Sequence, residues 1–119
     1  MTATSSSVPR LEDASTVTEL VDWGPVAAPI EGLSKTAGRM IHRGSHNESE
    51  CGIWTCTPGS WDCHVTSDEF CYFISGTATY THESGEVIEV GPDVVAFFAE
   101  GWRGTCVVHT TVRKAYMIR

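Results

Sequence analysis

The sequence has 119 residues, a length that predicts a single domain. Hydrophobic residues make up 41% and charged residues 19%, a balance typical of a globular protein whose core forms without metals or disulfides. Eight basic against 15 acidic residues give a net charge of −7, which disfavours nucleic acid as a partner because its phosphates are also negative.

The N-terminus and the cysteines indicate a cytoplasmic protein. The sequence has no run of about 18 apolar residues, so we expect no membrane partner. Its first 15 residues lack the basic start and apolar stretch of a secretory signal. The five cysteines are odd in number, which argues against a closed disulfide framework, and we expect them to be reduced thiols.

The N-terminal region differs in composition from the rest of the chain. We expect residues 1–22 to form a mobile tail, in which the apolar spacing of residues 11–21 predicts a short helix. Residues 24–37 are rich in Gly, Pro and Ala, as in an extended arm or loop. Residues 23–119 are then expected to form one β-barrel domain.

Short apolar or alternating runs, separated by Gly, Asn, Ser and Pro, fill the chain from residue 38 onward. We predict strands over residues 39–43, 52–56, 62–66, 69–74, 77–81, 86–90, 94–98, 105–108 and 112–118. Because no helical pattern separates these runs, parallel βαβ folds are excluded. The sequence therefore predicts an all-β protein of antiparallel strands, rolled into a sandwich or barrel.

Five segments of this region form an ordered set. They are residues 52–61 (GIWTCTPGSW), 68–76 (DEFCYFISG), 91–92 (GP), 97–105 (FFAEGWRGT) and 112–116 (VRKAY). In this order the segments resemble the cupin superfamily, and within it the small single-domain cupins related to (S)-ureidoglycine aminohydrolase. The resemblance spans about residues 39–119, extends toward residues 23–32, and implies a double-stranded β-helix, or jelly-roll barrel. A barrel of about eight strands holds one small ligand inside.

The resemblance also implies a metal site, of which this chain carries only a part. Glu69 is followed, after six residues, by Gly76, as in the first cupin motif, and His64 matches its first histidine. The second histidine position holds Thr66, and the histidine position of the second motif holds Gly104. A catalytic metal generally needs three protein ligands. The chain therefore has one ligand that matches the motif fully, Glu69, and one that matches in type, His64.

Strand parity offers one further ligand. Cys71 shares a strand face with Glu69, so its thiolate would join Glu69 and His64 in a mixed set. Such a set would hold a divalent metal, with zinc favoured over iron, manganese or nickel. The same residues also have simpler interpretations: His64 as a partly exposed strand histidine, Cys71 as a small core residue, and Glu69 as a solvated residue at a strand end.

Four residues are candidates for catalysis: Glu69 and His64 as ligands or general bases, and Lys114 and Tyr116 on one face of the last strand. If that face points inward, Lys114 forms an ion pair with Glu69; otherwise both belong to a solvated edge strand. Residues expected to line the pocket are Trp54, Thr66, Phe73, Phe97, Trp102 and Cys106.

These residues support two functional hypotheses. The first is a protein that binds a small molecule inside the barrel, beside an incomplete metal site. The alternative is a metal-dependent hydrolase, isomerase or lyase that acts on a small nitrogen- or carbonyl-containing metabolite. An open barrel edge and the extended arm predict a homodimer.

Overall fold

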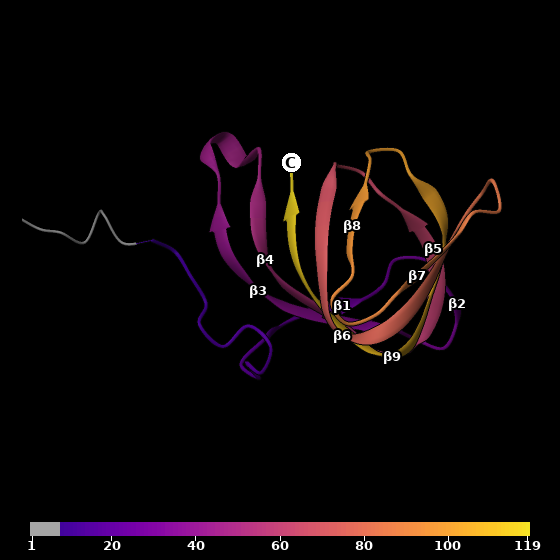
Figure 1. The fold of residues 1–119 in the computed structure, drawn as a ribbon, viewed down its shortest axis with the longest axis horizontal. Helices are drawn as coiled ribbons and strands as arrows, with labels where there is room; N and C mark the ends of the chain where they lie inside the picture. The colour runs from indigo at the N-terminus through magenta and orange to yellow at the C-terminus, as the bar shows by residue number, and fades with distance from the viewer. Residues whose placement is uncertain (1–7) are drawn as a thin grey trace, which may run out of the picture.

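The computed structural model describes residues 8–119, in which one curled antiparallel sheet forms an open barrel (Figure 1). Its strands are β1 (Val21–Pro25), β2 (Pro29–Glu31), β3 (Lys35–Arg43), β4 (Glu50–Cys56), β5 (Gly59–His64), β6 (Glu69–His82), β7 (Val87–Val90), β8 (Val95–Phe98) and β9 (Arg103–Ile118). A short 3-10 turn, η2 (Ser45–Asn47), joins β3 to β4. The predicted all-β jelly-roll barrel is thereby confirmed. Over residues 8–119, no helix has the length and apolar character needed to cross a membrane.

Two long strands, β6 and β9, hold the barrel together. They pair with each other along nearly their whole length, from Glu69↔Ile118 to His82↔Gly104. On the other side of β9, its last residues pair with β4 and its first residues pair with β5. The first residues of β6 also pair with β8, and its last residues pair with β7. Each long strand thus belongs to both facing halves of the barrel, and the inward side chains of the two halves meet in its interior.

The lengths of β6 and β9 explain why the sequence predicted a larger number of shorter strands. Residues 69–74 and 77–81 were expected as separate strands, and so were residues 105–108 and 112–118. In the structure each pair is one continuous strand, with shifts of the β6–β9 register between Phe73 and Ala78. Register shifts of this kind bend a strand without ending it. The Gly and Thr residues that resemble turns in the sequence therefore mark the bends by which one half of the barrel continues into the other.

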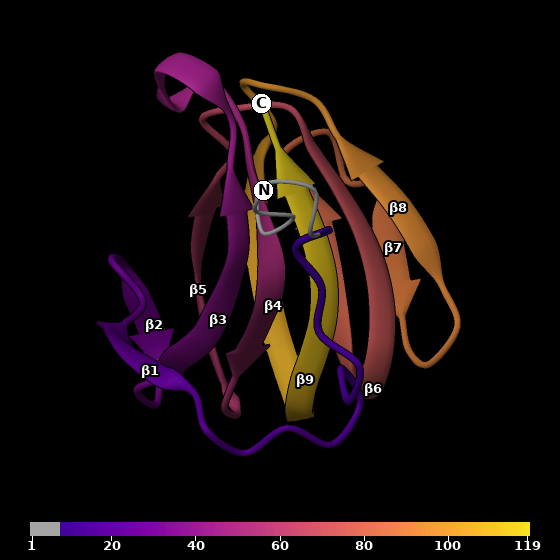
Figure 2. The same cartoon turned by 90° about the vertical axis from the view of Figure 1, so that its left-hand side faces the viewer.

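The N-terminal region departs from its prediction in two respects. The short helix over residues 11–21 was wrong, since this segment forms only a turn, with the Val17 amide donating to the Asp13 carbonyl at 2.9 Å. The Arg113 guanidinium donates to the carbonyls of Ala14 and Val17 at 3.0 and 2.8 Å. This contact holds the segment against β9 as it crosses the barrel (Figure 2). Residues 24–37, expected as an arm or loop, contain β2 and parts of β1 and β3.

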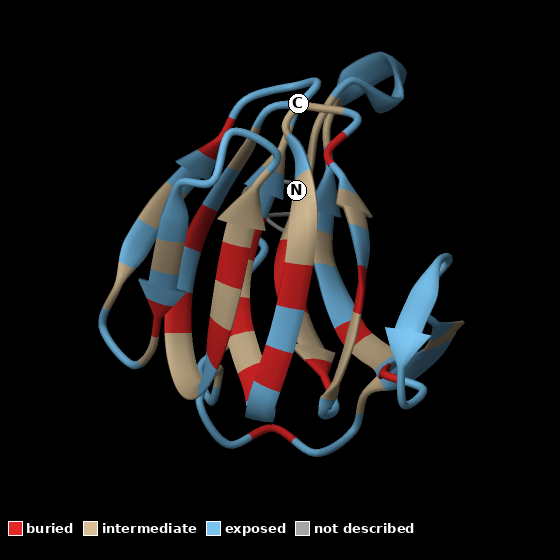
Figure 3. Cartoon of the chain, turned by 90° about the vertical axis from the view of Figure 1, so that its right-hand side faces the viewer, coloured by how far each residue is buried: buried red, intermediate tan, exposed pale blue. Residues whose placement is uncertain are grey.

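Burial alternates along the strands, as expected for a barrel with a filled interior (Figure 3). Among the most deeply buried side chains are those of Phe73, Val112, Cys56, Cys71 and Cys106. The Tyr80 ring packs against Phe98 and Trp102, with centroid distances of 4.9 and 6.1 Å. The inward side chains of the barrel thus form one continuous apolar core.

Candidate functional site

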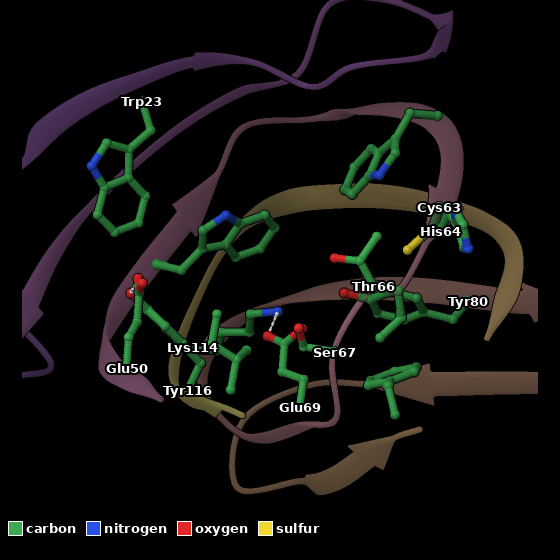
Figure 4. A pocket seen from close by; sticks show the side chains of 15 residues that line it. Trp23, Glu50, Cys63, His64, Thr66, Ser67, Glu69, Tyr80, Lys114 and Tyr116 are labelled. Carbon is green, nitrogen blue, oxygen red and sulfur yellow. Dashed lines mark hydrogen bonds and ion pairs between the residues drawn. The ribbon is translucent and has the colours of Figure 1, made fainter. Parts of the chain in front are cut away.

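A cavity of about 330 Å³ opens at the end of the barrel where β4, β6 and β9 present their inward side chains (Figure 4). Its apolar wall consists of Trp23, Trp54, Trp61, Val65, Tyr80, Phe98 and Ile118. Its polar groups come from Glu50, Cys63, His64, Thr66, Ser67, Glu69, Lys114 and Tyr116. An aromatic pocket of this size with a few polar groups is typical of small-molecule sites.

The centre of the site is an ion pair between β9 and β6. The Lys114 ammonium lies 2.8 Å from Glu69 Oε2, and the two side chains point toward each other in the cavity (Figure 4). The side chain of Lys114 is only 8% exposed and that of Glu69 is 20% exposed. The last strand, β9, therefore presents Lys114 inward. The alternative prediction, in which Lys114 lies on a solvated edge strand, is wrong.

Aromatic rings enclose the lysine. Trp54 on β4 and Phe73 on β6 are its direct cross-strand neighbours, and their ring centroids lie 4.3 and 5.9 Å from the ammonium. Burial by itself lowers the pKa of Lys114, but the Glu69 carboxylate, helped by nearby thiols, more than offsets burial and raises this pKa above its usual value. Lys114 is consequently a cation at neutral pH, able to donate hydrogen bonds but unable to act as a nucleophile.

Cys71 lies next to the ion pair as a buried thiol, outside the cavity lining. It is fully buried between Glu69 and Phe73 along β6, and its Sγ donates to Glu69 Oε2 at 3.4 Å. Burial raises the pKa of Cys71 to about 12, although Lys114 lowers it in part. Without a metal, Cys71 is therefore a protonated thiol at neutral pH.

The residues of the predicted metal site do not fit a metal. Among residues 8–119, no group of three or more His, Cys, Asp or Glu side chains could hold an ion. His64 is exposed and lies beside Cys63, across the cavity from Glu50 (Figure 4). Thr66 lines the cavity but supplies only a hydroxyl. The carboxylate of Glu69 is engaged by Lys114.

The packing around Gly104 shows why the histidine of the second cupin motif does not fit at this position. A Cβ atom at this position would lie 2.7 Å from Trp102 Cη2 and would overlap the carbonyl oxygen of Thr81. Cys63 and His82 are its cross-strand neighbours, and the His82 ring lies 5.4 Å from that of Trp102. The space that a histidine would need is therefore filled by the Trp102 indole.

The other predicted pocket residues divide between cavity and core. Trp54 lines the cavity, whereas Phe73 lies beneath Lys114 in the core. Trp102, which is half-buried, and Cys106, which is fully buried, both lie beside Tyr80 and outside the cavity lining. Phe97 was wrongly expected to face inward: its side chain is 62% exposed, because strand alternation on β8 turns its neighbour Phe98 inward.

The sequence reasoning missed a second polar network at the mouth. The Tyr116 hydroxyl donates to Glu50 Oε2 at 2.7 Å, and Arg43 contacts Glu50 Oε1 at 3.2 Å. Burial, followed by this hydrogen bond to Glu50, raises the pKa of Tyr116 well above its usual value. Strand parity was the signal available for Glu50, since it shares a face of β4 with Trp54.

The chain has clear similarities to known proteins at the level of fold. Residues 43–116 match the model of the EutQ-like cupin domain family. A structure of a protein of unknown function from Pseudomonas syringae pv. tomato aligns with a TM-score of 0.79 at 20% identity, covering 87% of this chain and 45% of that protein. The chain thus spans less than half of that protein's length. No curated protein matches the chain.

Two further structures are similar over about seven-tenths of this chain. The EutQ protein of Clostridium difficile aligns with a TM-score of 0.61 at 17% identity, over 71% of this chain and 68% of that one. A cupin superfamily protein from Desulfitobacterium hafniense aligns with a TM-score of 0.58 at 9% identity, over 70% and 75%. At these identities the likeness concerns the fold alone.

Proposed function

The chain belongs to the EutQ-like cupin domain family, and on this premise we propose that it binds a small metabolite in its barrel cavity without a metal. The observation that carries the proposal is the buried ion pair of Lys114 and Glu69, which places a cation beside the carboxylate of the first cupin motif. A buried ammonium supplies positive charge and hydrogen-bond donors to a ligand.

The ion pair defines which ligand groups fit. Only one of the three N–H donors of Lys114 is needed for Glu69. The contacts from Lys114 and Cys71 both reach Glu69 Oε2, so the Oε1 atom can accept from a ligand. A donor next to an acceptor complements an amide or ureido group, whose carbonyl accepts and whose N–H donates. The sequence also resembles ureidoglycine aminohydrolase-type cupins, and this resemblance favours a nitrogen-rich ligand of this kind.

Charge further narrows the ligand class. The ion pair is neutral overall, and Glu50 adds a second carboxylate at the mouth, paired with Arg43. Lys114 and Arg43 are thus already paired with glutamates, so neither is a free cation that would balance a ligand with two carboxylates. We therefore expect a neutral or singly charged molecule.

Binding of N-carbamoylglycine, which carries a ureido group, tests the proposal by calorimetry against glutarate, which carries only carboxylates. We expect N-carbamoylglycine to bind more tightly than glutarate, and Lys114→Met to abolish the difference. Lys35→Met, at an exposed lysine, is the matched control and should change nothing. Lack of binding, or equal binding to wild type and Lys114→Met, would refute the proposal.

One further measurement distinguishes metal-free binding from the metal-dependent alternative. If wild type binds N-carbamoylglycine equally before and after dialysis against a chelator, the site works without a metal. If binding or turnover appears only after zinc, iron, manganese or nickel is added, and is lost in Glu69→Ala, the alternative replaces our proposal.

A further inference from the structure

Trp23 occupies a β-bulge in β1 at the rim of the cavity. In the pairing of β1 with β3, Asp22 faces Ala37 and Gly24 faces Thr36, so Trp23 has no cross-strand partner. The Asp22 carboxylate accepts from the Gly24 amide at 2.8 Å, and Gly24 has a φ of 83°, which glycine adopts readily. Bulges beside functional sites redirect single side chains, and this one is held in shape by its own hydrogen bond.

The bulge aims the Trp23 indole at the cavity. Trp23 lines the cavity and lies at its mouth, on the same side as Glu50 (Figure 4). On β3, the backbone at Gly38 lies so close to the ring that an added Cβ would overlap it. Gly38 thus lets the indole rest directly on the strand, and a ring held in this way is positioned before any ligand arrives.

A tryptophan placed only for packing would hide most of its surface. Trp23 is instead 39% exposed, whereas Trp61, another residue of the cavity lining, is 7% exposed. Trp23 lines both this cavity and a second hollow beside Val21 and Met40, so part of its indole borders each of them. Aromatic side chains with one free surface at the mouth of a polar site commonly stack on flat ligands.

We propose that Trp23 is a specificity-determining residue, which stacks on the planar part of a ligand whose carbonyl or amide group is held by Lys114 and Glu69. The inference rests on the proposed function and narrows it to small planar molecules, aromatic or conjugated, that carry an amide or related group. Stacking of this kind contributes about two- to tenfold in affinity over an equally large non-planar group.

Two amides of similar size test this inference: benzamide, which is planar, and cyclohexanecarboxamide, which is not. Their affinities are measured by calorimetry on the full chain. For wild type we expect benzamide to bind about two- to tenfold more tightly. Trp23→Leu keeps an apolar side chain but removes the flat ring, so it should erase this preference, whereas Trp23→Phe should retain part of it. Val21→Ala, at an exposed position on the same strand, is the control and should preserve it.

Each outcome points to one conclusion. If both amides bind wild type and Trp23→Leu leaves their affinity ratio unchanged, the stacking role is refuted while the binding function stands. The same holds if Trp23→Leu weakens both amides equally, because Trp23 is then only a wall. If neither amide nor N-carbamoylglycine binds wild type, the proposed function fails and this inference fails with it. Far-ultraviolet circular dichroism of each variant identifies loss of the fold, and Trp23→Phe provides the result if Trp23→Leu does not fold.

Discussion

Lys114 pairs in register with Phe73, yet its ammonium reaches the carboxylate of Glu69, four residues earlier on β6, at 2.8 Å. The side chain thus runs along β6 from Phe73, past the buried Cys71, to Glu69. This path gives Lys114 two kinds of neighbour: the Trp54 ring beside it and a carboxylate at its tip. Both interactions favour the charged lysine in an otherwise apolar interior.

Removal of the ammonium should therefore destabilise the fold. Lys114→Met leaves the carboxylate of Glu69, only 20% exposed, without its cation, and we expect the free energy of unfolding to fall by about 2 kcal/mol. The double variant Lys114→Met/Glu69→Gln should recover much of this loss, because no unpaired charge remains. Urea denaturation provides the measurement, with exposed Lys35→Met as the control. Equal stability of wild type and Lys114→Met would show that the pair contributes nothing.

Gly104 offers a second test, independent of any ligand. A methyl group at this position would meet both Trp102 and the Thr81 carbonyl, so Gly104→Ala should destabilise the barrel by about 1–3 kcal/mol. At Gly91, by contrast, the nearest atoms to an added Cβ lie at 3.8 and 3.9 Å, an ordinary contact distance. Gly91→Ala is accordingly the matched control and should change little. Equal denaturation midpoints for Gly104→Ala and Gly91→Ala would contradict this packing argument.

The sequence predicted the barrel well and the site only in part, for physical reasons. Periodicity and turn residues report on strands, so the class of fold followed from local pattern. Whether Lys114 points inward depends on the phase of β9, which register shifts in β6 and β9 set over a long distance. No local pattern in the sequence carries that phase. Phe97 and Phe98 are adjacent aromatic residues on β8, and the sequence did not show which of the two faces inward.

Some contacts of the site were harder to predict from the sequence, although strand parity offered a signal for Glu50. Trp23 and Glu50 come to the cavity from segments outside the recognisable motifs, through a bulge and through the start of β4. The space at Gly104 is taken by Trp102, which is near in sequence but reaches over the strand through its ring. The placements of Trp23 and Trp102 arise from tertiary packing and are not encoded in spacing.

The predicted homodimer remains a prediction, and the outer face of the barrel supplies a surface for it. Phe97, Phe70 and Met117 form one cross-strand row, and each is at least half exposed. An apolar row of this kind is self-complementary for a second copy of the chain. Light scattering should then give about 26 kDa, twice the 12.9 kDa of one chain, and Phe70→Glu should give the monomer. Val87→Glu, at an exposed residue of β7, is the control; a monomeric wild type would contradict the prediction.

The three tyrosines provide an optical test of the site's electrostatics. Burial raises the pKa of Tyr80 and of Tyr116, and in Tyr116 the hydrogen bond to Glu50 adds to the effect. The hydrogen bond from the Tyr72 hydroxyl to Asp93, at 2.6 Å, raises the pKa of Tyr72 as well. Absorbance at about 295 nm should therefore show phenolate at higher pH in the native protein than in guanidinium. Tyr116→Phe should remove one late-titrating group, and superimposable native and denatured curves would refute the assignment.

The free energy of unfolding should fall in alkaline solution, because the buried thiols keep their protons to a higher pH in the folded chain than in the unfolded chain. Burial raises the pKa of Cys56 and Cys63 to about 11, and that of Cys71 and Cys106 to about 12, from an ordinary 9.0. Between these values the folded chain binds more protons than the unfolded chain, so the free energy of unfolding falls as pH rises above 9. The raised pKa of Lys114 acts in the same direction: its stabilisation is present below 10.5 and is lost as pH rises through the folded value.

Urea denaturation between about pH 7 and pH 10.5 measures this dependence. We expect a nearly flat profile up to about pH 8 and a steepening loss above pH 9, because the thiols of the unfolded chain ionise there first. Cys71→Ala removes one of these groups and should make the loss shallower. A flat profile up to pH 10.5, or an unchanged slope in Cys71→Ala, would mean that the interior thiols titrate as they do in water, and that Cys71 is more open to solvent than its burial indicates.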